Sequence, residues 1–243
     1  EPDMRSPEEA VAFFEALASV LKYIGVSDCR MEEGSLRCDI NLSLRPLGQG
    51  ELGIRTEMKN LNSFRAAYRA MVYEAKRQQE MLERGGIIIQ ETRRWDDRLG
   101  ISFPMRDKED VQDYRYFPEP DLIPIVVDKD WVEEIKSTIP ELPEQRRKRF
   151  MEQYRIPEYD AGVLTSSKAM ADFFERCVRL YNNPKTISNW LMGDLSRLLN
   201  ENGMQIEECL ISPENLVKML RLIDDGVISG SAAKTVIEDM FKT

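Results

Sequence analysis

Polar and apolar residues alternate strictly over residues 35–45 and again over residues 52–59. Alternation with a period of two is typical of a β-strand that has one buried face. Between the two segments, Pro46-Leu47-Gly48-Gln49-Gly50 favours a turn. The two segments therefore predict an antiparallel hairpin with one apolar and one charged face.

Helical periodicity flanks this hairpin on both sides. Ser6, Pro7 and Glu9 form the pattern of a helix start, and Gly25 favours the end of the same helix. A second helix is predicted to begin at residue 62 or 63 and to end at the glycine pair Gly85-Gly86.

The remaining chain separates into a strand-rich and a helical part. Beyond the second helix, extended segments are predicted at 87–95, 101–106 and 114–127. This order predicts an α+β fold with a largely antiparallel sheet. Past residue 128 the pattern changes, and helices are predicted at 130–136, 143–154, 167–181, 185–200, 213–224 and 229–241. We therefore predict an α+β domain over residues 1–135, followed by an all-α domain over residues 136–243.

Composition narrows the classes of function. The chain has 243 residues, of which 42% are hydrophobic and 32% charged, with a net charge of −9. Acidic residues are in excess on both sides of residue 128, which argues against a general nucleic-acid binder. Because there is no histidine, Ser-His-Asp and Cys-His catalysis are excluded and a Cys/His zinc site is disfavoured. Without an apolar run of membrane-spanning length or a secretory signal, we expect no membrane partner and a cytoplasmic protein.

The charged face of the predicted hairpin carries the candidate chemistry. Its side chains are Glu33, Ser35, Arg37, Asp39 and Asn41 on one strand and Arg55, Glu57 and Lys59 on the next. Two carboxylates on adjacent strands can bind Mg²⁺, and basic groups beside them can neutralise a transferring phosphoryl group. Donors in residues 59–63, at the start of the second helix, also suit an anion. There is no GxxxxGK[ST] sequence, so a nucleotide would not bind in a P-loop. A sheet face that only meets solvent would show the same alternation.

Six segments carry recognisable signatures. They are Glu1-Pro2-Asp3-Met4-Arg5-Ser6, Met31-Glu32-Glu33-Gly34-Ser35-Leu36-Arg37-Cys38-Asp39, Thr56-Glu57-Met58-Lys59-Asn60-Leu61-Asn62-Ser63-Phe64, Gln90-Glu91-Thr92-Arg93, Asp113-Tyr114-Arg115-Tyr116-Phe117-Pro118-Glu119-Pro120-Asp121 and Ser188-Asn189-Trp190-Leu191-Met192-Gly193. In this order they resemble the signatures of the B subunits of aspartyl/glutamyl-tRNA amidotransferases. Six long matches that span the chain are far more specific than one short motif.

The resemblance implies one component of an ATP-dependent ligase. In that family, the carboxylate of glutamate or aspartate misacylated onto tRNA(Gln) or tRNA(Asn) is activated as an acyl phosphate and amidated with ammonia from glutamine. The implied partners are an amidase-type glutaminase (the A subunit), a small C subunit and the misacylated tRNA, and the implied cofactors are ATP and Mg²⁺. The implied fold is the C-terminal part of a cradle domain related to glutamine synthetase, followed by a tRNA-facing helical domain. We expect the N-terminal part of the cradle and the tail domain to be missing, and the fragment alone to be inactive.

The resemblance also suggests roles for particular residues. Glu33 and Glu57 are the expected Mg²⁺ ligands, with Glu32 as the alternative to Glu33. The expected phosphate contacts are Arg37 and Lys59, which are also the expected catalytic residues, and then Arg93 and Arg115. For each basic residue the alternative is a structural salt bridge.

A basic run, Arg146-Arg147-Lys148-Arg149, is the candidate contact for tRNA phosphates. The resemblance places this run in the helical domain near the acceptor arm. The alternative is a solvated helix face that follows acidic Glu141 and Glu144. For the whole chain, the alternative to an enzyme subunit is a non-catalytic module of the same family that binds tRNA or partner subunits.

Overall fold

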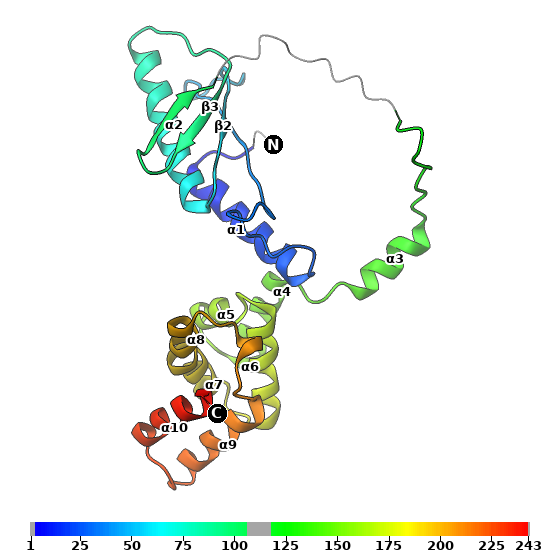
Figure 1. The fold of residues 1–243 in the computed structure, drawn as a ribbon, viewed down its shortest axis with the longest axis vertical. Coiled ribbons are helices and arrows are strands. Elements are labelled where there is room, and N and C mark those ends of the chain that lie inside the picture. The colour runs from blue at the N-terminus through cyan, green and yellow to red at the C-terminus, as the bar shows by residue number, and fades with distance from the viewer. Residues whose placement is uncertain (1–2, 106–117, 243) are drawn as a thin grey trace. The chain divides into compact units, whose positions relative to one another are not determined.

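The computed structural model describes residues 3–105 and 118–242, which fall into two compact units (Figure 1). The first unit comprises Glu1–Leu21 with Gly25–Thr138, and the second comprises Lys22–Ile24 with Ile139–Thr243. All strands of the described chain lie in the first unit, and the second is helical. The chain is therefore a mixed α+β region followed by a helical region.

Helix α1 (Pro7–Tyr23) begins where its sequence predicts. Ser6 Oγ accepts a hydrogen bond from the backbone N–H of Glu9 at 3.1 Å, and Glu9 Oε2 accepts one from the backbone N–H of Arg5 at 2.6 Å. These bonds satisfy donors that a helix start leaves unpaired. After the helix, Gly25 has a φ of +75°, the left-handed conformation that favours glycine.

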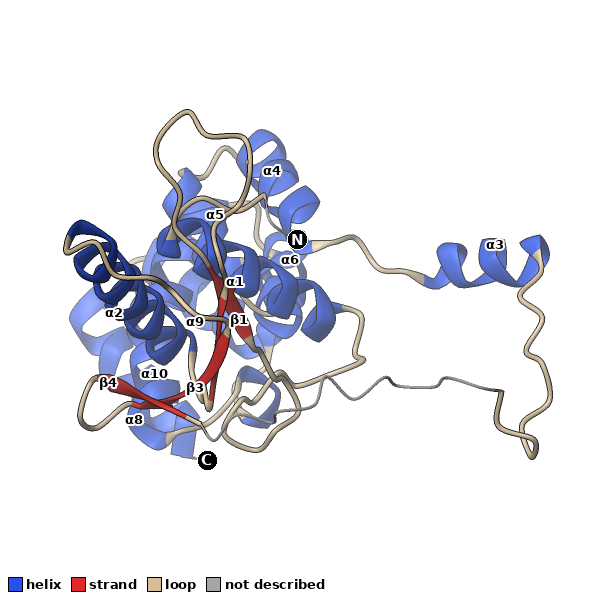
Figure 2. Cartoon of the chain, turned by 90° about the horizontal axis from the view of Figure 1, so that it is seen from above, coloured by secondary structure: helices blue, strands red, loops and turns tan. Residues whose placement is uncertain are grey.

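Four short strands form one sheet in the order β1-β2-β3-β4. The strands are drawn in red in Figure 2. Their bounds are Ile40–Leu42 for β1, Thr56–Lys59 for β2, Glu91–Asp96 for β3 and Ile101–Pro104 for β4. β1 and β2 are antiparallel with Asn41 opposite Glu57, which confirms the predicted hairpin pairing. β3 and β4 are also antiparallel.

The central pairing corrects the predicted antiparallel sheet. β2 and β3 run parallel, with Glu57 beside Thr92 and Lys59 beside Arg94. Between them lies α2 (Phe64–Glu83), a helix of 20 residues that is about 30 Å long. A helix of this length returns the chain to the end of the sheet where β2 began, so the next strand runs in the same direction. The sheet is therefore mixed.

Helix α2 covers one face of this sheet (Figure 1). Met58 and Trp95 are buried on that face against Ala66, Ala67 and Ala70 of the helix. Alternation along the strands sends the neighbouring side chains to the opposite face. That face, which we call the polar sheet face, carries Asn41, Glu57, Lys59, Thr92 and Arg94. One apolar and one polar face were predicted, and this is confirmed.

The first strand is shorter than predicted. Residues 31–36 form turns, in which Gly34 has a φ of +79° and Ser35 Oγ accepts a hydrogen bond from the backbone N–H of Arg30 at 2.8 Å. Such local side-chain bonds compete with strand pairing. Glu33 and Ser35 were predicted to share a strand face with Asp39, and this is wrong. Likewise, residues 87–90 and 118–127 form no strand in the described chain.

Helices make up the second unit, and α3 (Lys129–Thr138) precedes it. In order they are α4 (Pro143–Tyr154), α5 (Glu158–Leu164), α6 (Lys168–Leu180), α7 (Pro184–Trp190), a π-helical turn (Leu191–Leu195), α8 (Ser196–Asn202), a 3₁₀ turn (Ile206–Glu208), α9 (Pro213–Asp224) and α10 (Gly230–Lys242). Their core includes Phe150, Phe174, Leu191, Leu195 and Leu216. The sequence did not predict α5, which is too short for a clear period. No described helix combines the length and the apolar character needed to cross a membrane.

Candidate active site

Lys59 joins two carboxylates on the polar sheet face. Its Nζ lies 2.6 Å from Asp39 Oδ2 and 3.1 Å from Glu57 Oε1. Asp39 directly precedes β1, and the pairing of Asn41 with Glu57 brings this end of β1 alongside β2. The hydrogen bond to Asp39 is the main cause that raises the pKa of Lys59, so the ammonium form is favoured. The predicted interleaving of acid and base across paired strands is therefore confirmed.

Thr92 completes this cluster from β3. Its Oγ1 donates a hydrogen bond to Glu57 Oε2 at 2.7 Å. The parallel register of β2 and β3 puts the two residues side by side. Sequence reasoning missed Thr92, because its place beside Glu57 depends on a pairing between strands that α2 separates.

Glu33 lies elsewhere, in the turn over residues 31–36. Its Oε1 accepts a hydrogen bond from Arg30 Nη1 at 2.8 Å, and Glu32 beside it is exposed. A Cβ placed on Gly34 would lie 3.6 Å from Arg37 Nη2, so the exposed guanidinium of Arg37 lies over the same turn. Within the described residues Arg37 makes no ion pair. The carboxylate that accompanies Glu57 is thus Asp39, and no contact joins Glu33 to Glu57 in the described chain.

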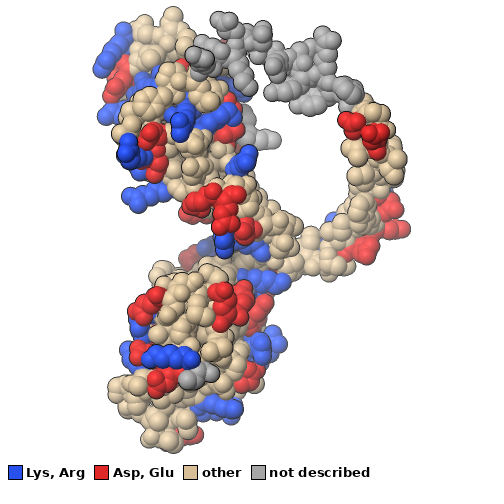
Figure 3. Space-filling view, in the orientation of Figure 1, with Lys and Arg blue, Asp and Glu red and all other residues tan. Residues whose placement is uncertain are grey.

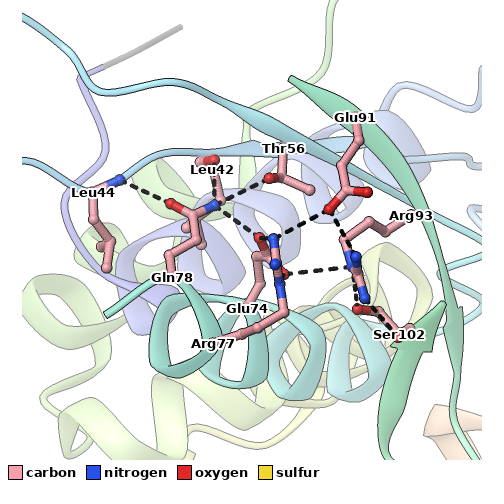
Figure 4. A network of polar contacts seen from close by, with 9 residues as sticks. All are labelled: Leu42, Leu44, Thr56, Glu74, Arg77, Gln78, Glu91, Arg93 and Ser102. Carbon is pink, nitrogen blue, oxygen red and sulfur yellow. Dashed lines mark hydrogen bonds and ion pairs between the residues drawn. The ribbon is translucent and has the colours of Figure 1, made fainter. Parts of the chain in front are cut away.

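Arg93 lies on the face covered by α2 and is only 8% exposed. It donates hydrogen bonds from Nη1 to Glu91 Oε1 at 2.7 Å and from Nε to Ser102 Oγ at 2.7 Å (Figure 4). Since the strand alternates, Arg93 faces away from Glu57 and Lys59. The structure therefore does not bring Arg93 to the polar sheet face, and the alternative of a structural salt bridge describes it. Arg115 lies outside the described residues.

The network around Arg93 links α2 with residues of all four strands (Figure 4). Glu74 is fully buried and accepts two hydrogen bonds from Arg77 and one from Gln78. Burial opposes the ionisation of Glu74, but these bonds outweigh it and lower its pKa. Gln78 also donates to Leu42 O and accepts from Leu44 N, both at 3.1 Å. The network thus supports the sheet from behind the candidate site.

Residues 59–63, at the start of the second helix, were predicted to offer hydrogen-bond donors to an anion. In the structure, polar side chains of this segment form hydrogen bonds within the protein. Ser63 Oγ caps α2 by accepting a hydrogen bond from Ala66 N at 3.0 Å. Asn60 Nδ2 donates to Trp95 O at 2.9 Å, and its φ is +68°. Two of the groups that the pattern offered to an anion therefore hold the strand end and the helix start in place.

The chemistry of the donor set fits Mg²⁺. Asp39, Glu57 and Thr92 present oxygen atoms, and the ammonium of Lys59 shows that positive charge is held between the two carboxylates. Mg²⁺ commonly takes one or two protein carboxylates and fills its other positions with water and substrate phosphate. No set of three or more His, Cys, Asp or Glu residues suited to a metal occurs in the described parts of the chain. The polar sheet face and the residue before β1 therefore offer Mg²⁺ two carboxylates, those of Glu57 and Asp39.

The basic run on α4 is largely committed to ion pairs. Arg146 is 6% exposed and pairs with Asp172 at 2.6 Å and with Glu175. Arg149 pairs with Glu141 at 2.6 Å and with Glu175 at 2.8 Å. Burial would raise the pKa of Glu175, but hydrogen bonds from Arg149, Arg146 and Tyr154 lower it to about 2.

Arg147 and Lys148, in the middle of the run, have weaker commitments. In the described chain both pair with a single exposed carboxylate, that of Glu144, at 2.9 and 3.5 Å. On the side of the helical unit seen in Figure 3, basic and acidic side chains are mixed without a continuous basic surface. The predicted phosphate patch of four residues is therefore wrong for Arg146, because a buried guanidinium cannot meet a nucleic acid.

Comparison with known proteins identifies the family. Residues 1–133 match the GatB/GatE catalytic domain. The chain belongs to the GatB family. In addition, residues 172–243 match the GatB domain.

Relatives of this GatB chain share its whole length. The B subunit of the aspartyl/glutamyl-tRNA(Asn/Gln) amidotransferase from Thermoanaerobacter sp. (strain X514) is 58% identical over 243 residues. The proteins of the same name from Carboxydothermus hydrogenoformans and Thermodesulfovibrio yellowstonii are 55% and 51% identical. Each comparison covers 100% of this chain but 50–51% of the relative. The chain thus spans about half the length of the curated relatives it matches.

The cluster on the polar sheet face lies within the GatB catalytic match. Asp39, Glu57, Lys59 and Thr92 all fall in residues 1–133. The basic run at 146–149 falls between the two GatB matches, which end at 133 and begin at 172. Catalytic chemistry is therefore best sought on the sheet.

Proposed function

We propose that this chain forms part of the B subunit of a tRNA-dependent amidotransferase. The B subunit uses ATP to activate the side-chain carboxylate of Glu-tRNA(Gln), of Asp-tRNA(Asn) or of both as an acyl phosphate, and ammonia derived from glutamine then displaces phosphate to form the amide. The observation that carries the proposal is the placement of Lys59 between Asp39 and Glu57 within the GatB/GatE catalytic match. The name of the relatives, which are B subunits of such an amidotransferase, supports it.

We assign the two metal-binding carboxylates to Asp39 and Glu57. Asp39 replaces Glu33 in this role, because it shares the ammonium of Lys59 with Glu57. Mg²⁺, when bound, neutralises phosphate oxygens of the nucleotide. Lys59 adds a second positive charge at the same place, which stabilises negative charge on a transferring phosphoryl group.

Two further side chains support this assignment. Thr92 orients the Glu57 carboxylate by bonding its second oxygen. Arg37 is exposed and makes no ion pair within the described chain, so it is free to contact phosphate. Preorganised charges of this kind act without rearrangement during the reaction.

The proposal also includes the partners of the chain, its compartment and its domains. The partners are an amidase-type glutaminase (the A subunit), a small C subunit and the misacylated tRNA, and the complex works in the cytoplasm. Residues 1–135 belong to a cradle domain of glutamine synthetase-like fold, and residues 136–243 to a tRNA-facing helical domain. The relatives are named as one of several subunits, which supports a multi-subunit complex.

The test is amidation by the full-length protein that contains this chain, purified with its partner subunits. Glu57→Gln and Asp39→Asn keep side-chain shape and remove charge. We expect each to lower ATP-dependent amidation of Glu-tRNA(Gln) by at least about 100-fold, with tRNA affinity unchanged. Glu51→Gln, on an exposed loop, is the matched control. Full activity in both site variants would favour the non-catalytic binding module.

A further inference from the structure

The strands of the described chain contain three basic residues, and two of them already have partners. They are Lys59, Arg93 and Arg94. Lys59 pairs with Asp39 and Glu57, and Arg93 pairs with Glu91 beneath α2. Arg94 is exposed, and none of the ion pairs of the described residues includes it. It is therefore the strand cation whose charge is left for a ligand.

Register places Arg94 next to the candidate site. In the parallel pairing of β2 and β3, Arg94 lies beside Lys59, and Thr92 lies beside Glu57. Since residues two apart share a face, Arg94 extends from the same side as Thr92. The next residue on that side, Asp96, uses Oδ1 to accept a hydrogen bond from Leu99 N at 2.9 Å in the following turn. Phe103 of β4, opposite Arg94, contributes a half-exposed ring and no charge.

The balance of charge explains what Arg94 adds. Lys59 is one cation shared by two carboxylates, so these three side chains together carry a net negative charge. Before Mg²⁺ binds, this cluster repels a phosphate group, and a further cation nearby weakens that repulsion and strengthens the attraction once the metal is bound. Arg94 supplies such a cation on β3, beside Lys59 of β2. A guanidinium can bind a phosphate through two parallel hydrogen bonds.

We propose that Arg94, and not Arg93, binds a phosphate group presented to the polar sheet face. This inference rests on the proposed function. A phosphate at this face has two sources, the triphosphate of ATP or the backbone at the acceptor end of tRNA. Both offer the same anionic oxygens, so binding of each ligand has to be measured separately.

The experiment compares Arg94→Ala and Arg94→Lys with Arg98→Ala in the full-length protein within its complex. Arg98 is the matched control, because it is exposed on the turn after β3 and lacks an ion pair in the described chain. Equilibrium binding of a non-hydrolysable ATP analogue and of tRNA(Gln) is measured for each, together with the KM of both substrates. Far-UV circular dichroism confirms folding.

We expect Arg94→Ala to lower the affinity for one of the two ligands about 10- to 100-fold, because a pair of charged hydrogen bonds is lost. Arg94→Lys recovers part of the loss. Weaker analogue binding identifies the nucleotide as the source, and weaker tRNA binding with a smaller salt dependence identifies the acceptor end.

Two outcomes would overturn the inference, and Glu57→Gln in the same preparations separates them. If Arg94→Ala matches Arg98→Ala in both binding assays while Glu57→Gln is inactive, Arg94 is a solvated residue and the proposed function stands. If Arg94→Ala has no effect and Glu57→Gln remains fully active, the proposed function fails as well.

Discussion

Thr92 Oγ1 donates a hydrogen bond to Glu57 Oε2 at 2.7 Å, across the parallel pairing of β2 and β3. Lys59 lies 3.1 Å from the other oxygen of the same carboxylate. Each oxygen of Glu57 is thus held by a different side chain, and rotation of the carboxylate would break both contacts. Thr92 is a positioning residue in this arrangement, since it acts on the ligand through Glu57.

The first prediction concerns this hydroxyl. Thr92→Val keeps the branched shape that suits a strand but removes the donor to Glu57. We expect the rate of amidation at low Mg²⁺ to fall about 10-fold, because a hydrogen bond to a charged group is lost. The rate is measured as a function of Mg²⁺ concentration, and the half-saturating concentration should rise.

Thr92→Ser is the control for the loss of the hydroxyl. It retains the donor and should stay close to the wild type in Mg²⁺ dependence. If Thr92→Val and Thr92→Ser behave alike, the hydrogen bond to Glu57 does not position the carboxylate.

A second prediction concerns the stability of the helical unit at acidic pH. The pKa of Glu175 is lowered from 4.5 to about 2 by its bonds with Arg149, Arg146 and Tyr154. The ionised form is therefore favoured in the folded state, and its contribution is complete above pH 4.5 and is lost as the pH falls through about 2. We expect Glu175→Gln to lower the free energy of unfolding at pH 7 by about 3 kcal/mol.

Urea unfolding at several pH values measures this effect. Between pH 4.5 and 2 the wild type should lose more stability than Glu175→Gln, which lacks the titrating group. Glu144→Gln is the control, because Glu144 is exposed and pairs only with Arg147 and Lys148 in the described chain. Its cost should stay below about 1 kcal/mol. Parallel pH curves for the wild type and Glu175→Gln would contradict the assignment.

The third prediction gives buried Arg146 a different role from Arg147 and Lys148 in the basic run. Arg147→Ala with Lys148→Ala should weaken tRNA binding several-fold and reduce its salt dependence, because half-buried Arg147 and exposed Lys148 can still reach phosphates and displace their counterions. Arg146→Ala should instead lower the free energy of unfolding by about 3 kcal/mol, since it leaves Asp172 without its ion-pair partner and removes one of the two guanidinium groups that pair with Glu175. Filter binding over a salt series and urea unfolding distinguish the two effects.

A charge-matched pair elsewhere on the helical unit serves as the control. Arg179 and Lys218 are exposed on α6 and α9, and replacing both by Ala removes the same charge. If this control weakens tRNA binding as much as the Arg147 and Lys148 pair does, the effect is one of net charge alone.

Local alternation predicted a good part of the site. It paired β1 with β2, and it put Glu57 and Lys59 on one polar face. The same alternation also indicates that Arg93 lies on the buried face, because Trp95 is apolar and lies two residues further along β3. A residue that shares the face of a buried tryptophan points into the core, whereas Arg94 points the other way.

Long-range pairings could not be predicted in this way. Thr92 and Glu57 are 35 residues apart, and the parallel register between their strands depends on how α2 crosses the sheet. Likewise, Arg149 and Glu175 are 26 residues apart and meet because two helices pack together. A sequence pattern reports which side of an element is apolar, but it does not report which element lies opposite.

The π-helical turn at Leu191–Leu195 lies inside one continuous helical segment, between α7 and α8. A π turn holds one residue more than an α turn and bulges locally to hold it. Leu198 and Leu199 of α8 are buried beyond this bulge. A Cβ on Gly193 would have no atom within 4 Å. Deleting that residue would leave an ordinary α turn and keep both leucines in the core, so the fold accepts a change in the number of residues at this point as well as in their identity.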